Sequence, residues 1–65
     1  MTSMEVKAYG IGIQEANKHR RIVPACKSAE MMKLLEEKRN NLLPIIKAYD
    51  AGVAYEINRQ TRLEF

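Results

Sequence analysis

The feature that most restricts the fold is a series of apolar residues in the second half of the chain, spaced three or four residues apart. This spacing places side chains on one face of an α-helix. The series, with Lys38 in register, consists of Met31, Leu34, Leu35, Leu42, Ile45, Ile46, Tyr49, Val53 and Ile57. It predicts an amphipathic helical stretch from about residue 29 to residue 61.

Two residues interrupt this stretch. Ser28 is a good N-cap, but Pro44 cannot continue a regular helix, because it lacks an N–H and its ring clashes with the carbonyl of Asn40. We therefore expect helices at about 29–40 and 43–61, either separate or joined as one kinked helix. Gly52 either caps a helix end or lies inside a helix. Small residues surround it, and they would let another helix approach closely: Ala48, Ala51 and Ala54.

The first third of the chain has two interpretations. Thr2 and Glu5 match a capping box. A helix at about 4–19 is predicted by the spacing of Val6, Tyr9, Ile13 and Ala16. Gly10 and Gly12 oppose it, since each costs about 1 kcal/mol relative to alanine inside a helix, and residues 9–13 also alternate as a strand would. We favour the helix, in which the glycines either allow close packing or loosen the first turns.

These patterns predict an all-α protein of two or three helices, a small helical hairpin or bundle that forms one domain over residues 1–65. Between the helices, Ile22 and Val23 are expected to tuck beneath them. A 65-residue chain buries a modest share of its surface, and one cysteine forms no internal disulfide. Self-association is the remaining way to gain stability, so we expect a homo-oligomer.

Catalysis is not expected. Cys26 and His19 are the only candidates for a nucleophile and a base, and nothing else in the sequence supports such a pair. We expect no metal site, cofactor or small-molecule substrate, and Cys26 to be a buried or half-buried small hydrophobe. The longest apolar run, residues 42–46, is far too short to span a bilayer. With no signal-peptide pattern and an unpaired cysteine, we expect a cytoplasmic protein without a membrane contact.

The charge of the chain is unevenly distributed. The net charge is +3, and the whole excess lies within residues 1–27. The one concentrated basic run consists of Lys18, His19, Arg20 and Arg21. Such a run contacts phosphates in nucleic-acid-binding proteins, but cations are also favoured at a solvated helix C-terminus by the helix dipole.

The segment LLPIIKAYDAGVAYEINRQT, residues 42–61, resembles the first two helices of some helix-turn-helix DNA-binding domains. In these domains one helix runs into Ala-Gly-Val and a second helix begins with a pattern similar to Tyr55-Glu56-Ile57. The resemblance implies a degenerate helix-turn-helix at 42–62. If residues 53–62 act as the recognition helix, the side chains facing the major groove are Tyr55, Asn58, Arg59 and Arg62.

We therefore expect a small non-enzymatic interaction protein, a regulator, inhibitor or adaptor that presents a helical surface to a protein partner or to its own copy. In size and lack of catalytic groups it resembles accessory proteins of phages and mobile elements. The expected interface is the apolar stripe of Met31, Leu35, Leu42, Ile46, Tyr49, Val53 and Ile57. The alternative is a nucleic-acid-binding regulator that uses residues 18–21, together with Arg59 and Arg62.

Overall fold

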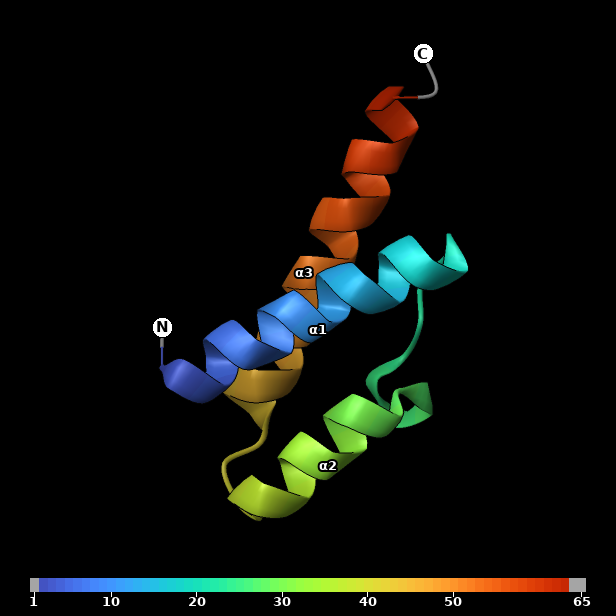
Figure 1. The fold of residues 1–65 in the computed structure, drawn as a ribbon. Coiled ribbons are helices and arrows are strands. Elements are labelled where there is room, and N and C mark those ends of the chain that lie inside the picture. The colour runs from blue at the N-terminus through green and yellow to red at the C-terminus, as the bar shows by residue number, and fades with distance from the viewer. Residues whose placement is uncertain (1, 64–65) are drawn as a thin grey trace.

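The computed structural model describes residues 2–63 and consists of three α-helices with one 3₁₀ turn (Figure 1). The helices are α1 (Ser3–His19), α2 (Ala29–Lys38) and α3 (Leu43–Leu63), and the 3₁₀ turn is η1 (Ala25–Lys27). The predicted all-α fold is confirmed, and the predicted helices at 4–19, 29–40 and 43–61 agree with the observed bounds to within two residues. The strand interpretation of residues 9–13 is wrong, because these residues lie inside α1.

The ends of α1 follow the local chemistry of the sequence. The capping box is present: the Glu5 N–H donates to Thr2 Oγ1 and the Thr2 N–H donates to Glu5 Oε1, each at 3.2 Å. These hydrogen bonds lower the pKa of the Glu5 carboxyl. At the other end Arg20 adopts a left-handed conformation (φ 57°), and its N–H donates to the Ala16 carbonyl. This conformation turns the chain out of the helix.

The break between α2 and α3 settles the two alternatives for Pro44. The Ser28 hydroxyl caps α2 by accepting from the Met31 N–H at 3.3 Å, and α2 ends at Lys38, where Arg39 has a φ of 68°. Asn41 also has a positive φ. Pro44 then lies in the first turn of α3, where the N–H that proline lacks would have no partner within the helix. The two helices are therefore separate rather than one kinked helix.

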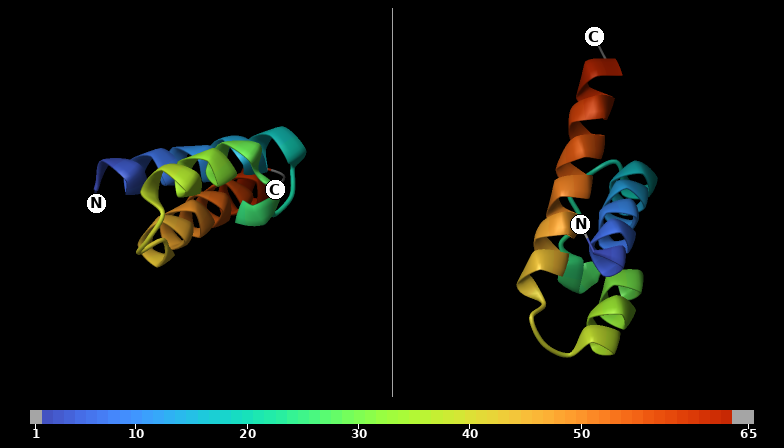
Figure 2. Two further views of the ribbon diagram at one scale, coloured as in Figure 1. Left: turned by 90° about the horizontal axis from the view of Figure 1, so that it is seen from below. Right: turned by 90° about the vertical axis from the view of Figure 1, so that its left-hand side faces the viewer.

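The helices form two layers. Both views in Figure 2 place α1 and α2 on the same side of α3. In Figure 1, α1 crosses α3 obliquely, and the C-terminal half of α3 extends beyond α1. The core lies between the layers and consists of Ala8, Ala16, Met31, Leu34, Ile45, Ala48, Tyr49 and Val53.

The crossing of α1 and α3 depends on two glycines. A Cβ atom at Gly12 would overlap the Tyr49 carbonyl oxygen, and a Cβ atom at Gly52 would overlap the Tyr9 carbonyl oxygen. The predicted role of small residues in close helix packing is therefore confirmed for Gly52 and the buried Ala48, whereas Ala51 and Ala54 are exposed. The alternative in which Gly52 caps a helix is wrong, because α3 continues through it. For the same reason residues 42–62 contain no turn, and the predicted helix-turn-helix is not formed.

Two predictions about the connector between α1 and α2 need correction. Val23 is buried, as expected, but Ile22 is 70% exposed. Cys26 was expected to be buried or half-buried, and it is exposed on η1. Both residues lie in the connector between α1 and α2, where no regular spacing of apolar residues predicts which side chains are buried. Their exposure is instead decided by how the connector packs against α3.

The glycines provide a direct test of the helix crossing. We expect Gly12→Ala and Gly52→Ala each to lower the free energy of unfolding by about 2 kcal/mol or more, because the added methyl group meets rigid backbone. Gly10→Ala is the matched control. Its Cβ would have no neighbour within 4 Å, so its better helix propensity should raise the free energy of unfolding by up to about 1 kcal/mol. Urea unfolding of dilute protein, followed by circular dichroism, measures all three; equal effects would contradict the observed crossing.

Candidate functional site

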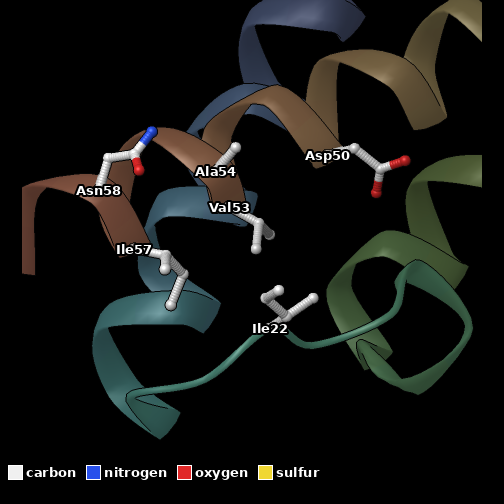
Figure 3. A pocket seen from close by; sticks show the side chains of 6 residues that line it. All are labelled: Ile22, Asp50, Val53, Ala54, Ile57 and Asn58. Carbon is white, nitrogen blue, oxygen red and sulfur yellow. The ribbon is translucent and has the colours of Figure 1, made fainter. Parts of the chain in front are cut away.

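An open apolar groove runs between the connector and the side of α3 (Figure 3). Its volume is about 340 Å³. The residues that line it are Ile22, Asp50, Val53, Ala54, Ile57 and Asn58. In Figure 3 the side chain of Ile22 faces Val53 and Ile57 across the groove. We call this feature the Ile22 groove.

Ile22 is held in its exposed position by its neighbours in the chain. The left-handed Arg20 turns the backbone away from α1. On the other side, the buried Tyr49 hydroxyl donates a hydrogen bond of 2.6 Å to the Val23 carbonyl oxygen, and Pro24 favours an extended backbone at Val23. Burial raises the pKa of the Tyr49 hydroxyl, so it remains a neutral donor at physiological pH. Ile22 is therefore attached to α3 through Val23, while its own side chain is left largely uncovered.

The chemistry of the Ile22 groove suits an apolar side chain from another molecule. Val53 is buried, Ile57 is half-buried and Ala54 is exposed. The side of the groove formed by α3 is therefore apolar, and the small side chain of Ala54 leaves it accessible. Asp50 and Asn58 add polar groups at the edge, one turn before and one turn after Ala54. Within the described residues Asp50 forms no ion pair. A cationic group beside the apolar one would therefore find a carboxylate at this edge.

The apolar residues predicted as an interface are divided between the core and the surface. Met31, Tyr49 and Val53 are buried within the single chain, and so are not free to contact a partner over their whole side chains. Four others are half-buried: Leu35, Leu42, Ile46 and Ile57. Only Val53 and Ile57 line the Ile22 groove. Met31, Leu35, Tyr49, Val53 and Ile57 thus belong to or pack against the core between the helical layers, and the C-terminal part of the stripe borders an open site.

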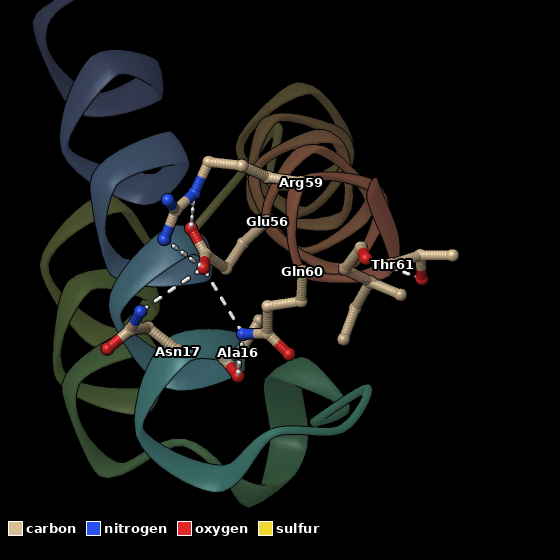
Figure 4. Close-up of polar contacts among 7 residues, drawn as sticks. Ala16, Asn17, Glu56, Arg59, Gln60 and Thr61 are labelled. Carbon is tan, nitrogen blue, oxygen red and sulfur yellow. Dashed lines mark hydrogen bonds and ion pairs between the residues drawn. The ribbon is translucent and has the colours of Figure 1, made fainter. Parts of the chain in front are cut away.

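Glu56 is the centre of a polar cluster where the end of α1 meets α3 (Figure 4). Its side chain is only 1% exposed. Arg59 binds both carboxylate oxygens, with Nε to Oε1 at 3.0 Å and Nη2 to Oε2 at 2.7 Å. Asn17 Nδ2 and Gln60 Nε2 each donate to Oε2 at 3.2 Å, and Gln60 Nε2 also donates to the Ala16 carbonyl. These interactions, led by that of Arg59, lower the pKa of Glu56 to about 2.

The basic residues predicted to contact nucleic acid lie near the same end of the α1–α3 pair. Asn17 contacts Glu56, so the basic run begins one residue beyond this contact. All four of its members, Lys18, His19, Arg20 and Arg21, are exposed. His19 Nε2 lies 3.6 Å from Glu15 Oε2, and Arg59 is paired with Glu56. On α3 a shallow hollow of about 350 Å³ is lined by Tyr55, Asn58, Arg59 and Arg62.

The residues considered for catalysis are not brought together by any interaction in the described chain. His19 pairs with Glu15 on α1, whereas Cys26 lies on η1. Residues 2–63 contain no cluster of three or more His, Cys, Asp or Glu side chains placed to hold a metal ion. None of the described helices combines the length and the apolar character needed to cross a membrane.

Sequence reasoning missed two parts of this arrangement. Ile22 was assigned to the core, and no local signal distinguishes it from the neighbouring Val23. Glu56 was overlooked as a buried residue, although a signal was present: Ala48, Gly52, Glu56 and Gln60 recur every four residues. Such a series lies along one side of a helix, so the small residues at its start also indicated where Glu56 and Gln60 would lie.

Comparison of the chain with protein-family models, with curated proteins and with solved structures finds no match.

The Glu56 cluster predicts how stability depends on pH. The pKa of Glu56 is lowered from 4.5 to about 2 in the folded chain, so between these values the unfolded chain binds more protons than the folded chain. The resulting contribution to stability is present above pH 4.5 and is lost as the pH falls towards 2. In Glu56→Gln the urea midpoint should be lower at neutral pH and should fall less over this window.

Glu37→Gln is the control, because it removes an exposed carboxylate from α2. Urea midpoints measured at several values between pH 2 and pH 7 compare the two variants with the unmodified chain. The interpretation of the Glu56 cluster would be wrong if Glu56→Gln kept the full dependence on pH.

Proposed function

We propose that this protein is a small interaction protein that binds an apolar side chain of a protein partner in the Ile22 groove. The partner segment best suited to the groove is an amphipathic helix with one large aliphatic or aromatic residue as its anchor. A lysine or arginine about one turn from this anchor would face Asp50. The protein would then act as a regulator, inhibitor or adaptor through binding alone.

One observation carries this proposal: Ile22 is 70% exposed, the highest value among the large exposed hydrophobic residues. Isolated exposed hydrophobic residues are common on protein surfaces and need no explanation. Ile22, however, faces further apolar surface from Val53, Ala54 and Ile57 across an open groove. An apolar patch rimmed by polar residues is typical of a protein-interaction site.

The size of the groove also favours a side chain over a small-molecule ligand. Ligand pockets bury most of the ligand surface, whereas the Ile22 groove is widely open to its surroundings. A volume of about 340 Å³ accommodates one large anchor side chain together with part of the helix that carries it. Helix-in-groove recognition commonly relies on a few anchors spaced three or four residues apart.

A library of amphipathic helical peptides displayed on phage tests this proposal. Selection on the full chain should enrich peptides that combine a large apolar anchor with a lysine or arginine one turn away. The affinity of an enriched peptide is then measured by fluorescence anisotropy. We expect Ile22→Asp and Ala54→Gln to weaken binding at least about tenfold, or ~1.4 kcal/mol, because one places a charge in the groove and the other fills it.

Leu43→Asp is the matched control for these variants. Leu43 is 62% exposed at the start of α3 and does not line the groove, so this variant should bind the peptide within about twofold of the unmodified chain. If no peptide is enriched, or if both groove variants bind as well as the control, the proposed function is wrong.

A second candidate function is binding of nucleic acid, and the observation that favours it is the group of exposed cations at one end of the α1–α3 pair. Lys18, Arg20 and Arg21 are exposed there. Two features weigh against it: Glu56 neutralises Arg59, and α3 continues without a turn. Anisotropy with duplex DNA and single-stranded RNA, at about 50 and 200 mM salt, separates the two functions, because phosphate contacts weaken steeply as salt rises.

A further inference from the structure

Gly10 has no role in the packing of the single chain. Gly12 and Gly52 each face backbone atoms of the opposite helix, whereas a Cβ atom at Gly10 would have no neighbour within 4 Å. None of the glycines has a positive φ, so Gly10 is not needed for a special backbone conformation either. Because glycine is the poorest helix former after proline, Gly10 weakens the middle of α1 without the close helix contact that Gly12 and Gly52 provide within the chain.

The surroundings of Gly10 are apolar on one flank. At about 100° per residue, Gly10 lies on the side of α1 opposite the buried residues Ala8, Gly12 and Ala16. Val6 and Ile13 lie one turn before and one turn after it on the apolar flank, where Val6 is 57% exposed and Ile13 is half-buried. The exposed Lys7 and Gln14 lie on the other flank.

Two tyrosines extend this surface towards α3. The rings of Tyr9 and Tyr55 lie 6.3 Å apart between centroids, at an interplanar angle of 45°. Tyr55 is 53% exposed, and Tyr9 is half-buried. We call the surface formed by these uncharged residues the α1 outer face; it comprises Val6, Tyr9, Gly10, Ile13 and Tyr55.

We propose that the α1 outer face binds a second copy of this chain, with the two α1 helices crossing at Gly10. Gly12 and Gly52 already allow such a close crossing within the chain, and Gly10 offers the same absence of a side chain on the opposite side of α1. A two-fold axis at Gly10 brings the same surface of both copies together. The apolar residues before and after Gly10 then lie beside the corresponding residues of the other copy.

The charges around the α1 outer face are compatible with an antiparallel crossing. At about 100° per residue, Val6 and Ile13 lie on one flank of Gly10, and Lys7 and Gln14 lie on the other. With Gly10 at the axis, Val6 of one copy therefore lies beside Ile13 of the other, and Lys7 lies beside the neutral Gln14. The neutral Ser3 lies opposite Asn17 in the same way. No like charges meet, and the antiparallel helix dipoles attract each other.

A second copy would also bury apolar surface that this small chain cannot bury within its own core. Its core contains several small residues, among them Ala8, Ala16 and Ala48. The single cysteine provides no internal disulfide, and small domains with limited cores commonly gain stability by association. A patch centred on five residues is at the low end of interface size, so we expect a dissociation constant on the order of 10 μM.

The dimer leaves the Ile22 groove open, because the two surfaces share no residue. Each dimer therefore carries two grooves, and a partner with two suitable helices would bind more tightly than a partner with one. This consequence rests on the proposed function, whereas the dimer itself does not.

Sedimentation equilibrium of the full chain, over roughly 5 μM to 1 mM, measures the association. The unmodified chain should form dimers, and Val6→Asp should raise the dissociation constant at least tenfold. Gly10→Ala should have two opposite effects: a higher urea midpoint in dilute solution and a dissociation constant raised at least tenfold. Lys33→Ala, at an exposed site on α2, is the control for helix propensity and should leave the dissociation constant unchanged.

A chain that stays monomeric over this whole range overturns the proposal. So does a dimer whose dissociation constant is unaffected by both Gly10→Ala and Val6→Asp, because association would then use another surface. Ile22→Asp separates the two proposals: it should leave the dimer intact while it weakens peptide binding. A dimer that Ile22→Asp disrupts, with Val6→Asp and Gly10→Ala neutral, would place the self-contact in the groove instead.

Discussion

The close crossing of α1 and α3 is the contact on which the rest of the structure depends. At Gly12 and Gly52 the backbone of each helix fits against the backbone of the other without an intervening side chain. Ala8 and Ala16, four residues before and after Gly12, and Ala48, four residues before Gly52, continue the same contact; rows of residues spaced by four are the ridges of the commonest class of helix packing. Because the two helices are so close, larger side chains such as Met31 and Tyr49 fill the space towards α2 and the connector.

Beyond the glycines the same crossing becomes polar, and this change fixes how the helices are aligned. Four residues after Gly52, on the same side of α3, Glu56 is almost completely buried. A buried carboxylate is costly unless donors surround it, and here Arg59, Asn17 and Gln60 provide them. A shift of α1 along α3 would remove Asn17 and the Ala16 carbonyl from this cluster. The polar end therefore selects one alignment, whereas the glycines alone specify only close approach.

The tight crossing also explains why a chain with so many apolar residues leaves some of them outside. Helices in backbone contact have room for few side chains between them, so large apolar residues on the flanks of α1 and α3 remain accessible. Val6 and Tyr55 are examples on the two helices, and Ile22 is exposed on the connector beside α3. They are distributed over two surfaces, the Ile22 groove and the α1 outer face, and both of our proposals arise from this property of the fold.

The sequence by itself predicted the helical segments, the capping box of Thr2 and Glu5, the Ser28 cap and an interruption at Pro44, because these features depend on residues within a few positions of one another; the structure decided that the interruption separates two helices. It also indicated, through the small residues around Gly52, that another helix would pack closely there. Only the tertiary structure decided that α1 is the helix that packs against Gly52. It also decided that Ile22 faces outward while Val23 is buried, and that hydrogen-bond donors surround the Glu56 carboxylate. These outcomes depend on contacts between residues 26 to 44 positions apart, and helical periodicity carries no information about which distant residues will meet.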